Sequence, residues 1–178
     1  MTDPPAADLG LPPTFNTWAQ VTFLHMYALT CRFRMLPPEL APVWHQHLLN
    51  HFFYKAEEYM TIQHAIVTAA GRGKHLKDLF VQWRGIMTTY DEGLVKGDAV
   101  LATAIWRNIF KGVDDVDMVK VSEVVAYLRA MVQRLESVPY EDIVSGAILF
   151  NGPTSGKKVI GSRRAEPGSL PTDVGQDE

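Results

Sequence analysis

The chain has 178 residues, of which 47% are hydrophobic and 21% are charged. A chain of this size and composition buries one sizeable core, so a single globular domain is expected. The formal net charge of −3 at pH 7 argues against a protein whose main task is to wrap nucleic acid, because such proteins usually carry a clear basic excess. The one cysteine, Cys31, excludes an intramolecular disulfide.

Residues 1–13 predict a disordered N-terminal segment without a targeting signal. The first basic residue is Arg32, whereas a secretory signal begins with a basic group and a mitochondrial import sequence is rich in arginine. We therefore expect no import signal in this chain. Residues 14–31 carry no formal charge, but their polar side chains favour a helix buried within the protein over a membrane-spanning helix.

Two helices are predicted in the first part of the chain. The first begins at a cap, either Thr14 or Asn16, and ends near Met35, before two prolines. The second runs from about residue 39 to residue 70. Its expected stop is the run Gly71-Arg-Gly73, because glycine disfavours the interior of a helix.

Two further helices are predicted, with a turn between them. The third spans about residues 74–90, and its apolar side chains recur every three or four residues, which predicts that they face the core: Leu76, Leu79, Phe80, Trp83, Ile86 and Met87. Residues 93–97 begin and end with glycine and predict the turn. After it, Asp98 is expected to cap a fourth helix that ends at Phe110.

A fifth helix and a short sixth helix complete the predicted domain. Asp117 ends an acidic run that suits a helix start, and the fifth helix is expected to reach about Val138. Pro139 then suits the first turn of a helix that ends at about Ile148.

The composition changes after residue 150 and predicts a disordered tail over residues 151–178. The tail has few large apolar side chains with which to offset the entropy lost on ordering. Its basic pairs, Lys157-Lys158 and Arg163-Arg164, suit contact with an anionic surface, but acidic residues of the same tail balance their charge, which favours a solvated segment. The predicted fold is a single-domain all-α bundle of five or six helices over residues 14–150.

Three histidines form the densest group of titratable side chains. His47 and His51 lie four residues apart and would share one face of a helix, while His45 would point elsewhere. A zinc protease has glutamate after the first histidine of such a pair, but Leu48 is found here, and tetrahedral zinc needs a third ligand. Packed or surface histidines without a bound metal are therefore favoured. The alternative is a helical metal-dependent hydrolase that uses this cluster.

Basic and aromatic side chains give two candidate binding surfaces. The most basic part of the expected helices contains Arg72, Lys74, Lys77 and Arg84, which suit contact with phosphates, although basic surface is usually only solvated. Large apolar groups gather on the first two helices. Trp18, Phe23, Phe52 and Phe53 either belong to an ordinary core or line a groove for an apolar partner segment. No residues suggest a catalytic nucleophile or a cofactor site.

The run from Tyr90 to Phe110, a glycine-punctuated charged segment followed by an alanine-rich helix with an aromatic end, resembles the signature of the ubiquinol-cytochrome c chaperone family. The resemblance covers residues 14–111 well and continues more loosely to about residue 148. Shorter matching runs are Thr14-Phe-Asn-Thr-Trp18, Leu24-His25, Asn50-His-Phe-Phe53 and Ala56-Glu57.

This resemblance implies an all-helical assembly factor for respiratory complex III and not an enzyme. Members of the family associate peripherally with the mitochondrial inner membrane on its matrix side, without a transmembrane span. The implied partners are newly synthesised cytochrome b, a small partner chaperone and the mitochondrial ribosome near its exit tunnel, and no cofactor is implied. On this interpretation, the four aromatic residues of the first two helices form a candidate groove for cytochrome b. The four basic residues between Arg72 and Arg84 form a candidate ribosome face.

Within the signature, mainly structural roles are expected. Gly93 and Gly97 would allow tight turns, Asp98 would cap the next helix, and Trp106 would pack. Arg107 would pair with Asp91 or Glu92. Signature residues that face solvent would instead contact the partner chaperone. The signature residues are Tyr90, Asp91, Glu92, Gly93, Gly97, Asp98, Trp106, Arg107 and Asn108.

Overall fold

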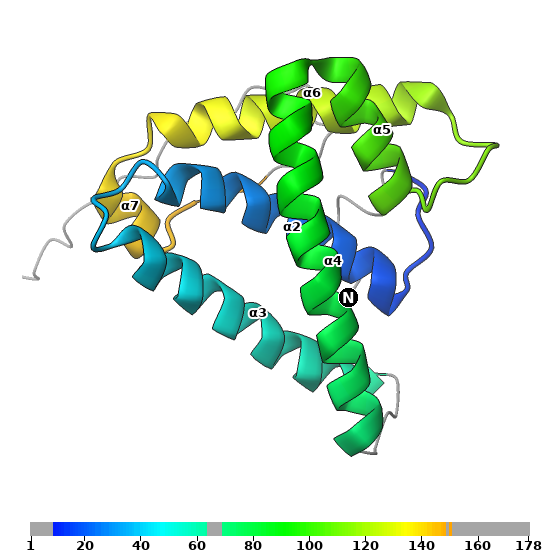
Figure 1. Ribbon diagram of the computed structural model, residues 1–178, viewed down its shortest axis with the longest axis horizontal. Helices are drawn as coiled ribbons and strands as arrows, with labels where there is room; N and C mark the ends of the chain where they lie inside the picture. The colour runs from blue at the N-terminus through cyan, green and yellow to red at the C-terminus, as the bar shows by residue number, and fades with distance from the viewer. Residues whose placement is uncertain (1–8, 64–68, 149, 151–178) are drawn as a thin grey trace, which may run out of the picture.

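The computed structural model describes residues 9–63, 69–148 and 150, and all regular secondary structure within them is helical (Figure 1). This confirms the predicted all-α fold. The predicted disordered tail lies outside the described residues. The helices, in chain order, are α2 (Phe15–Phe33), α3 (Ala41–Gln63), α4 (Ala69–Lys96), α5 (Asp98–Asn108), α6 (Met118–Glu136) and α7 (Tyr140–Val144).

The helices pack around a crossing of α4 over α2 and α6. Figure 1 shows α2 and α6 side by side, with the long helix α4 running across both. The short helix α5 packs against α4 and α6, and α3 packs against α2 and the first half of α4. Helix α7 lies beside the connection from α2 to α3 (Figure 1). The apolar stripes of α2, α4 and α6 therefore meet in one interior.

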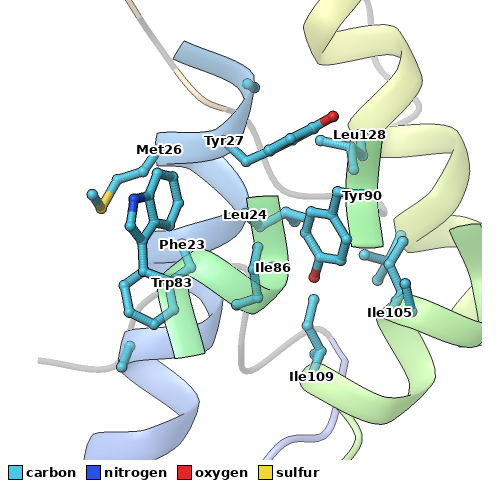
Figure 2. Close-up of a cluster of buried hydrophobic side chains, with 14 of the residues drawn as sticks. Phe23, Leu24, Met26, Tyr27, Trp83, Ile86, Tyr90, Ile105, Ile109 and Leu128 are labelled. Carbon is cyan, nitrogen blue, oxygen red and sulfur yellow. The ribbon is translucent and has the colours of Figure 1, made fainter. Parts of the chain in front are cut away.

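The core at this crossing is rich in aromatic side chains (Figure 2). Tyr27 of α2 and Tyr90 of α4 are fully buried and meet edge to face, with ring centroids 5.2 Å apart. Leu101, Ile105 and other aliphatic side chains of α5 and α6 fill the space beside them. Burial of large apolar side chains in such a core is the main contribution to the stability of the fold.

Helix starts follow the predicted caps at two places. The Thr14 hydroxyl accepts a hydrogen bond from the Thr17 amide at 3.2 Å, and the Asp117 carboxylate accepts one from the Val119 amide at 2.9 Å. Both bonds satisfy amides of the first helical turn, which have no partner within the helix. Leu9, in the segment predicted to be disordered, is buried against the core instead.

The limits of α4 differ from the prediction. The helix begins at Ala69 and runs through Gly71 and Gly73, so the run predicted as a stop lies inside its first turns. It also continues past residue 90 to Lys96, so Gly93 is a helical residue and not part of a turn. The cost of glycine in a helix, about 1 kcal/mol each relative to alanine, is smaller than the stabilisation from the apolar side chains that α4 buries.

Two other expectations need correction. Phe80 was assigned to the core stripe of α4, but its side chain is 43% exposed because it lies at the edge of the buried face. The sixth helix was expected to reach residue 148, but α7 ends at Val144, where Gly146 follows with a φ of +71°. Such a conformation suits glycine after a helix end.

Candidate functional site

Tyr90, the first residue of the family-like signature, is a core residue. Its side chain has no exposed surface, and its hydroxyl is buried without a hydrogen-bond partner. Burial raises the pKa of the Tyr90 phenol well above its ordinary value, because the low-dielectric interior disfavours the phenolate. Figure 2 shows the ring between side chains of α2, α5 and α6. Tyr90 therefore positions α4 rather than meeting a partner directly.

Asp91 links α4 to α2 through a polar network at the edge of the core. Arg34 donates from both terminal nitrogens to the two carboxylate oxygens of Asp91, at 2.6 and 3.0 Å, and the Tyr27 hydroxyl donates to the same carboxylate at 2.8 Å. Partial burial alone would raise the pKa of Asp91, but the bonds from Arg34 and Tyr27 outweigh it and lower the pKa. Arg34 was not foreseen as a site residue.

The acidic residues of the signature do not pair with Arg107, so that expectation was wrong. Asp91 is held by Arg34, and Glu92 accepts a hydrogen bond from Lys96 one helical turn later, at 2.6 Å. Arg107 is exposed on α5. The reason is geometric, since α4 turns Asp91 toward α2 and Glu92 toward solvent.

The two glycines of the signature have different roles. Gly97 has a φ of +114°, a conformation that favours glycine, and it forms the N-cap of α5. Gly93 lies within α4, close to Leu101 of α5. A Cβ atom on Gly93 would lie 2.7 Å from the Leu101 Cα and 2.8 Å from the Leu101 Cβ. The expected tight turn at Gly93 is thus replaced by a close contact between two helices.

Asp98 does not cap α5, which corrects a second expectation. Gly97 occupies the N-cap position, and no side chain caps this helix end. Asp98 instead forms an ion pair with Arg129 of α6, and Arg129 also donates to the Gly93 carbonyl at 3.4 Å. Arg129 therefore joins α4, α5 and α6 at one point. Nothing in the local sequence around Asp98 indicates this partner, which lies 31 residues away.

A double-mutant cycle of Asp98→Ala and Arg129→Ala is expected to give a coupling free energy of about 0.2–1 kcal/mol, the usual range for partly exposed ion pairs. Chemical unfolding of the four proteins measures it, and the coupling should shrink in high salt because salt screens exposed charges. Additive effects of the two substitutions would show that the pair contributes nothing to stability.

Trp106 and Asn108 close the signature. Trp106 is half-buried against the core, as expected, and its indole nitrogen donates to the Val113 carbonyl at 2.8 Å, which fixes the loop after α5. The Asn108 amide donates to the Ala104 carbonyl at 2.9 Å within the last turn of α5. Both contacts are internal, so the signature mainly builds the junction of α4, α5 and α6.

The structure brings the four predicted groove residues together. Trp18 and Phe23 of α2 pack on Phe52 of α3, with ring centroids 5.6 and 4.7 Å apart, and Phe52 contacts Phe53 at 5.2 Å. Phe23 and Phe52 are buried, whereas Trp18 and Phe53 are half-buried. In this state only the last two can meet a partner.

Further aromatic residues contact this cluster, among them Tyr59 of α3 and Phe80 of α4. Tyr59 stacks on Trp18 with ring centroids 5.0 Å apart, and Phe80 lies 6.1 Å from Phe53. Tyr59 stands seven residues after Phe52, two turns along the same helix, so the two side chains share one face of α3. Phe80 belongs to another helix, so only the fold places it here.

The predicted basic surface follows the first half of α4. Lys74, Lys77 and Arg84 are exposed to solvent, whereas Arg72 is half-buried and lies 3.4 Å from the Glu57 carboxylate of α3. Since Arg72 already has an acidic neighbour, the other three carry most of the positive charge available to a partner. The exposed side chain of Phe80 lies on the same stretch of helix.

The three histidines on α3 do not converge. His45 turns toward the core, its ring lies 6.3 Å from that of Trp83, and its Nε2 is buried without a hydrogen-bond partner. His47 and His51 are exposed on the outer face. Within the described residues, no three histidine, cysteine or acidic side chains are placed to hold a metal ion.

The free energy of unfolding is expected to fall as the pH drops below about 6.5, the ordinary value for histidine, and His45 should contribute to this loss. Burial lowers the pKa of folded His45, and the charge of Arg34 lowers it further. The unfolded chain therefore binds a proton more readily. Chemical unfolding at several pH values should show a weaker pH dependence in His45→Gln. His47→Gln, which removes an exposed imidazole from the same helix, is the control; an unchanged slope in His45→Gln would contradict the assignment.

One pocket of about 380 Å³ lies between the N-terminal segment and the loop from α5 to α6. Lys120 lines this pocket and donates to the Leu9 carbonyl at 3.1 Å. None of the predicted site residues lines it. Separately, no helix among residues 9–63 and 69–148 is sufficiently long and apolar to span a bilayer.

Comparison with known proteins finds a matching family and several relatives with similar sequences. The family described as Ubiquinol-cytochrome C chaperone matches residues 7–150. The chain is 34% identical over 146 residues to Protein CBP3, mitochondrial, of Saccharomyces cerevisiae. The aligned region covers 82% of this chain and 44% of that protein. The chain is also 30% identical over 137 residues to ubiquinol-cytochrome-c reductase complex assembly factor 1 of Xenopus laevis. This alignment covers 76% of this chain and 66% of the Xenopus protein.

A human protein, ubiquinol-cytochrome c reductase complex assembly factor 1, is 27% identical over 143 residues, with coverages of 75% of this chain and 44% of the human one. The chain thus spans about half the length of the curated relatives it matches. No solved structure matches the chain.

Proposed function

The chain belongs to the ubiquinol-cytochrome c chaperone family, and we propose that it is a non-enzymatic assembly factor for ubiquinol-cytochrome c reductase, respiratory complex III. The observation that carries the proposal is the family match over residues 7–150, which contain every helix described above. Relatives from several animals are named as assembly factors of this complex, and the yeast relative is named as mitochondrial.

The proposed client is newly synthesised cytochrome b, held together with a small partner chaperone on the matrix side of the inner membrane. Cytochrome b consists mostly of transmembrane helices, so a holder must cover apolar surface reversibly. The edge of the aromatic cluster supports this role, since Trp18, Phe53 and the exposed ring of Phe80 present apolar surface from three helices. Phe23 and Phe52 would support this surface from beneath.

The proposed contact with the mitochondrial ribosome uses the basic face of α4. Lys74, Lys77 and Arg84 are exposed along one stretch of the helix, beside the aromatic edge. Cations on a rigid helix suit contact with the phosphates of ribosomal RNA. A holder that binds the ribosome here would keep its apolar surface close to an emerging client.

Expression in yeast that lacks Protein CBP3, mitochondrial, tests the function. With an added import sequence, the chain is expected to raise the amount of assembled complex III on native gels and to copurify with cytochrome b and ribosomal proteins. If the protein is imported and folded but neither result is obtained, the proposed function is wrong. Metal analysis of the same preparation tests the hydrolase alternative, because a stoichiometric metal would favour it.

Two double variants in the same system test the ribosome face. Lys74→Glu/Lys77→Glu should abolish cosedimentation with ribosomes at moderate salt, since it reverses the charge of the basic face. Lys96→Glu/Lys111→Glu changes the net charge equally, at exposed lysines outside this face, and should leave binding intact. Equal losses in both would show that binding follows net charge alone.

A further inference from the structure

Helices α2, α3 and α7 meet at one end of the molecule (Figure 1), and these helices and their connections carry exposed apolar residues there. We call this surface the end patch. Between 37% and 55% of each of its side chains is exposed, although all are large and apolar. Its members are Met35 and Leu40 of the connection before α3, Val43 of α3, and Tyr140 and Val144 of α7.

Contacts beneath the end patch hold its parts together. The Trp44 indole nitrogen donates to the Tyr140 hydroxyl at 3.2 Å, which ties the start of α3 to α7. Leu36 and Ile143 are buried in one small cluster, which ties the connection after α2 to the same helix. The elements that carry the end patch are therefore held together. Single exposed apolar residues need no explanation, but several of them on neighbouring elements suit an interaction site.

Acidic groups border the end patch. Glu39 precedes Leu40, and Glu141 follows Tyr140, with both carboxylates exposed. The neighbouring cation Arg34 is held by Asp91, and Arg32 donates to the Val138 carbonyl at 3.1 Å. A segment that carries apolar side chains between basic ones would match this arrangement in both polarity and charge.

The chain itself contains such a segment. Residues 157–164 read Lys-Lys-Val-Ile-Gly-Ser-Arg-Arg, with Val159 and Ile160 between two basic pairs. We propose that this segment docks on the end patch, with its two apolar side chains on the apolar surface and its basic pairs near Glu39 and Glu141. The segment lies beyond residues 7–150, the range shared with the family, so the proposal concerns this chain in particular.

The length of the chain permits this contact. The ring of Phe150 lies 4.8 Å from that of His25 on α2. The end of α2, at Phe33, is eight residues farther on, about 12 Å at the helical rise of 1.5 Å per residue. Residues 151–156, fully extended, span about 20 Å. Lys157 can therefore reach the end patch without any change in the described fold.

Tethering makes a small contact sufficient. Two apolar side chains and a few ion pairs on an exposed surface would bind weakly between separate molecules. A short covalent connection to the described fold can give an effective concentration in the millimolar range, at which a weak contact becomes substantially populated. Any partner of the end patch would then have to displace the tail.

Hydrogen exchange of the full chain, measured by mass spectrometry, tests the proposal. Amides of residues 34–44 and 140–148 should exchange several-fold faster in Val159→Asp/Ile160→Asp than in the natural sequence. The control is Leu170→Asp/Val174→Asp, which makes the same kind of change elsewhere in the tail and should leave these amides unaffected. Glu39→Lys/Glu141→Lys, with the tail intact, should also accelerate them.

Equal exchange in the natural sequence and in Val159→Asp/Ile160→Asp would overturn the proposal. Protection that rises with protein concentration would also overturn it, because the end patch would then pair with a second copy of the chain. If protection appears only when anionic phospholipid vesicles are added, the occupant is a membrane surface instead, and the tail assignment is wrong.

Discussion

Replacing Gly93 by alanine is expected to destabilise the fold by about 1–3 kcal/mol, the usual cost of inserting a group into a filled interior. The added methyl group would lie 2.7 Å from the Leu101 Cα, and a backbone atom cannot yield by changing rotamer. Helix α5 must therefore move away from α4, which weakens the packing of both on α6. The free energy of unfolding from urea titration measures the loss.

Gly85 provides a matched control on the same helix. It is helical and exposed, and a Cβ atom there would meet nothing within 4 Å. Gly85→Ala should be neutral or should stabilise the fold by about 1 kcal/mol, because alanine favours a helix more than glycine does. If both variants behaved alike, the close contact between α4 and α5 would not be the reason for glycine at position 93.

The sequence predicted the features that depend on neighbouring residues. Thr14 and Asp117 cap helices because their side chains reach amides two or three residues away. Both partners of such a bond therefore lie in the same short stretch of sequence. The prediction of an all-helical fold rested on apolar spacing of the same range. Helix existence could therefore be predicted, whereas helix limits depend on what the helix buries.

The misplaced limits of α4 illustrate this difference. Gly73 and Gly93 are unfavourable for a helix when they are considered alone, but α4 is held by buried side chains such as Trp83 and Ile86. The Asp98 prediction failed by one position, because Gly97 takes the cap and frees the carboxylate for Arg129. Local rules assign a residue its commonest role and contain no information about a partner on another helix.

The candidate site depends still more on distant contacts. Arg34 and Asp91 are 57 residues apart, and neither residue indicates the other in the sequence. The aromatic residues were predicted as a group because large apolar side chains gather on the first two helices. Their division into buried and half-buried members follows from how α2, α3 and α4 pack together, which the sequence pattern does not specify.

Phe23→Ala is expected to cost about 3–5 kcal/mol, the range for removing a buried aromatic ring. Phe23 is fully buried, and its ring lies 4.7 Å from Phe52 on α3 and 5.5 Å from Trp83 on α4, so the truncation leaves a cavity where three helices meet. Phe80→Ala removes a ring that is 43% exposed and should cost far less. Urea unfolding compares the two.

Together, these variants separate folding from client binding. If the aromatic edge holds cytochrome b, Phe80→Ala should keep the folded domain but reduce copurification of cytochrome b, whereas Phe23→Ala should reduce the amount of folded protein. Phe23→Leu retains most of the buried volume and should recover much of the stability. A stable Phe23→Ala protein would contradict the assignment of Phe23 to the core and would make it a direct candidate for the groove.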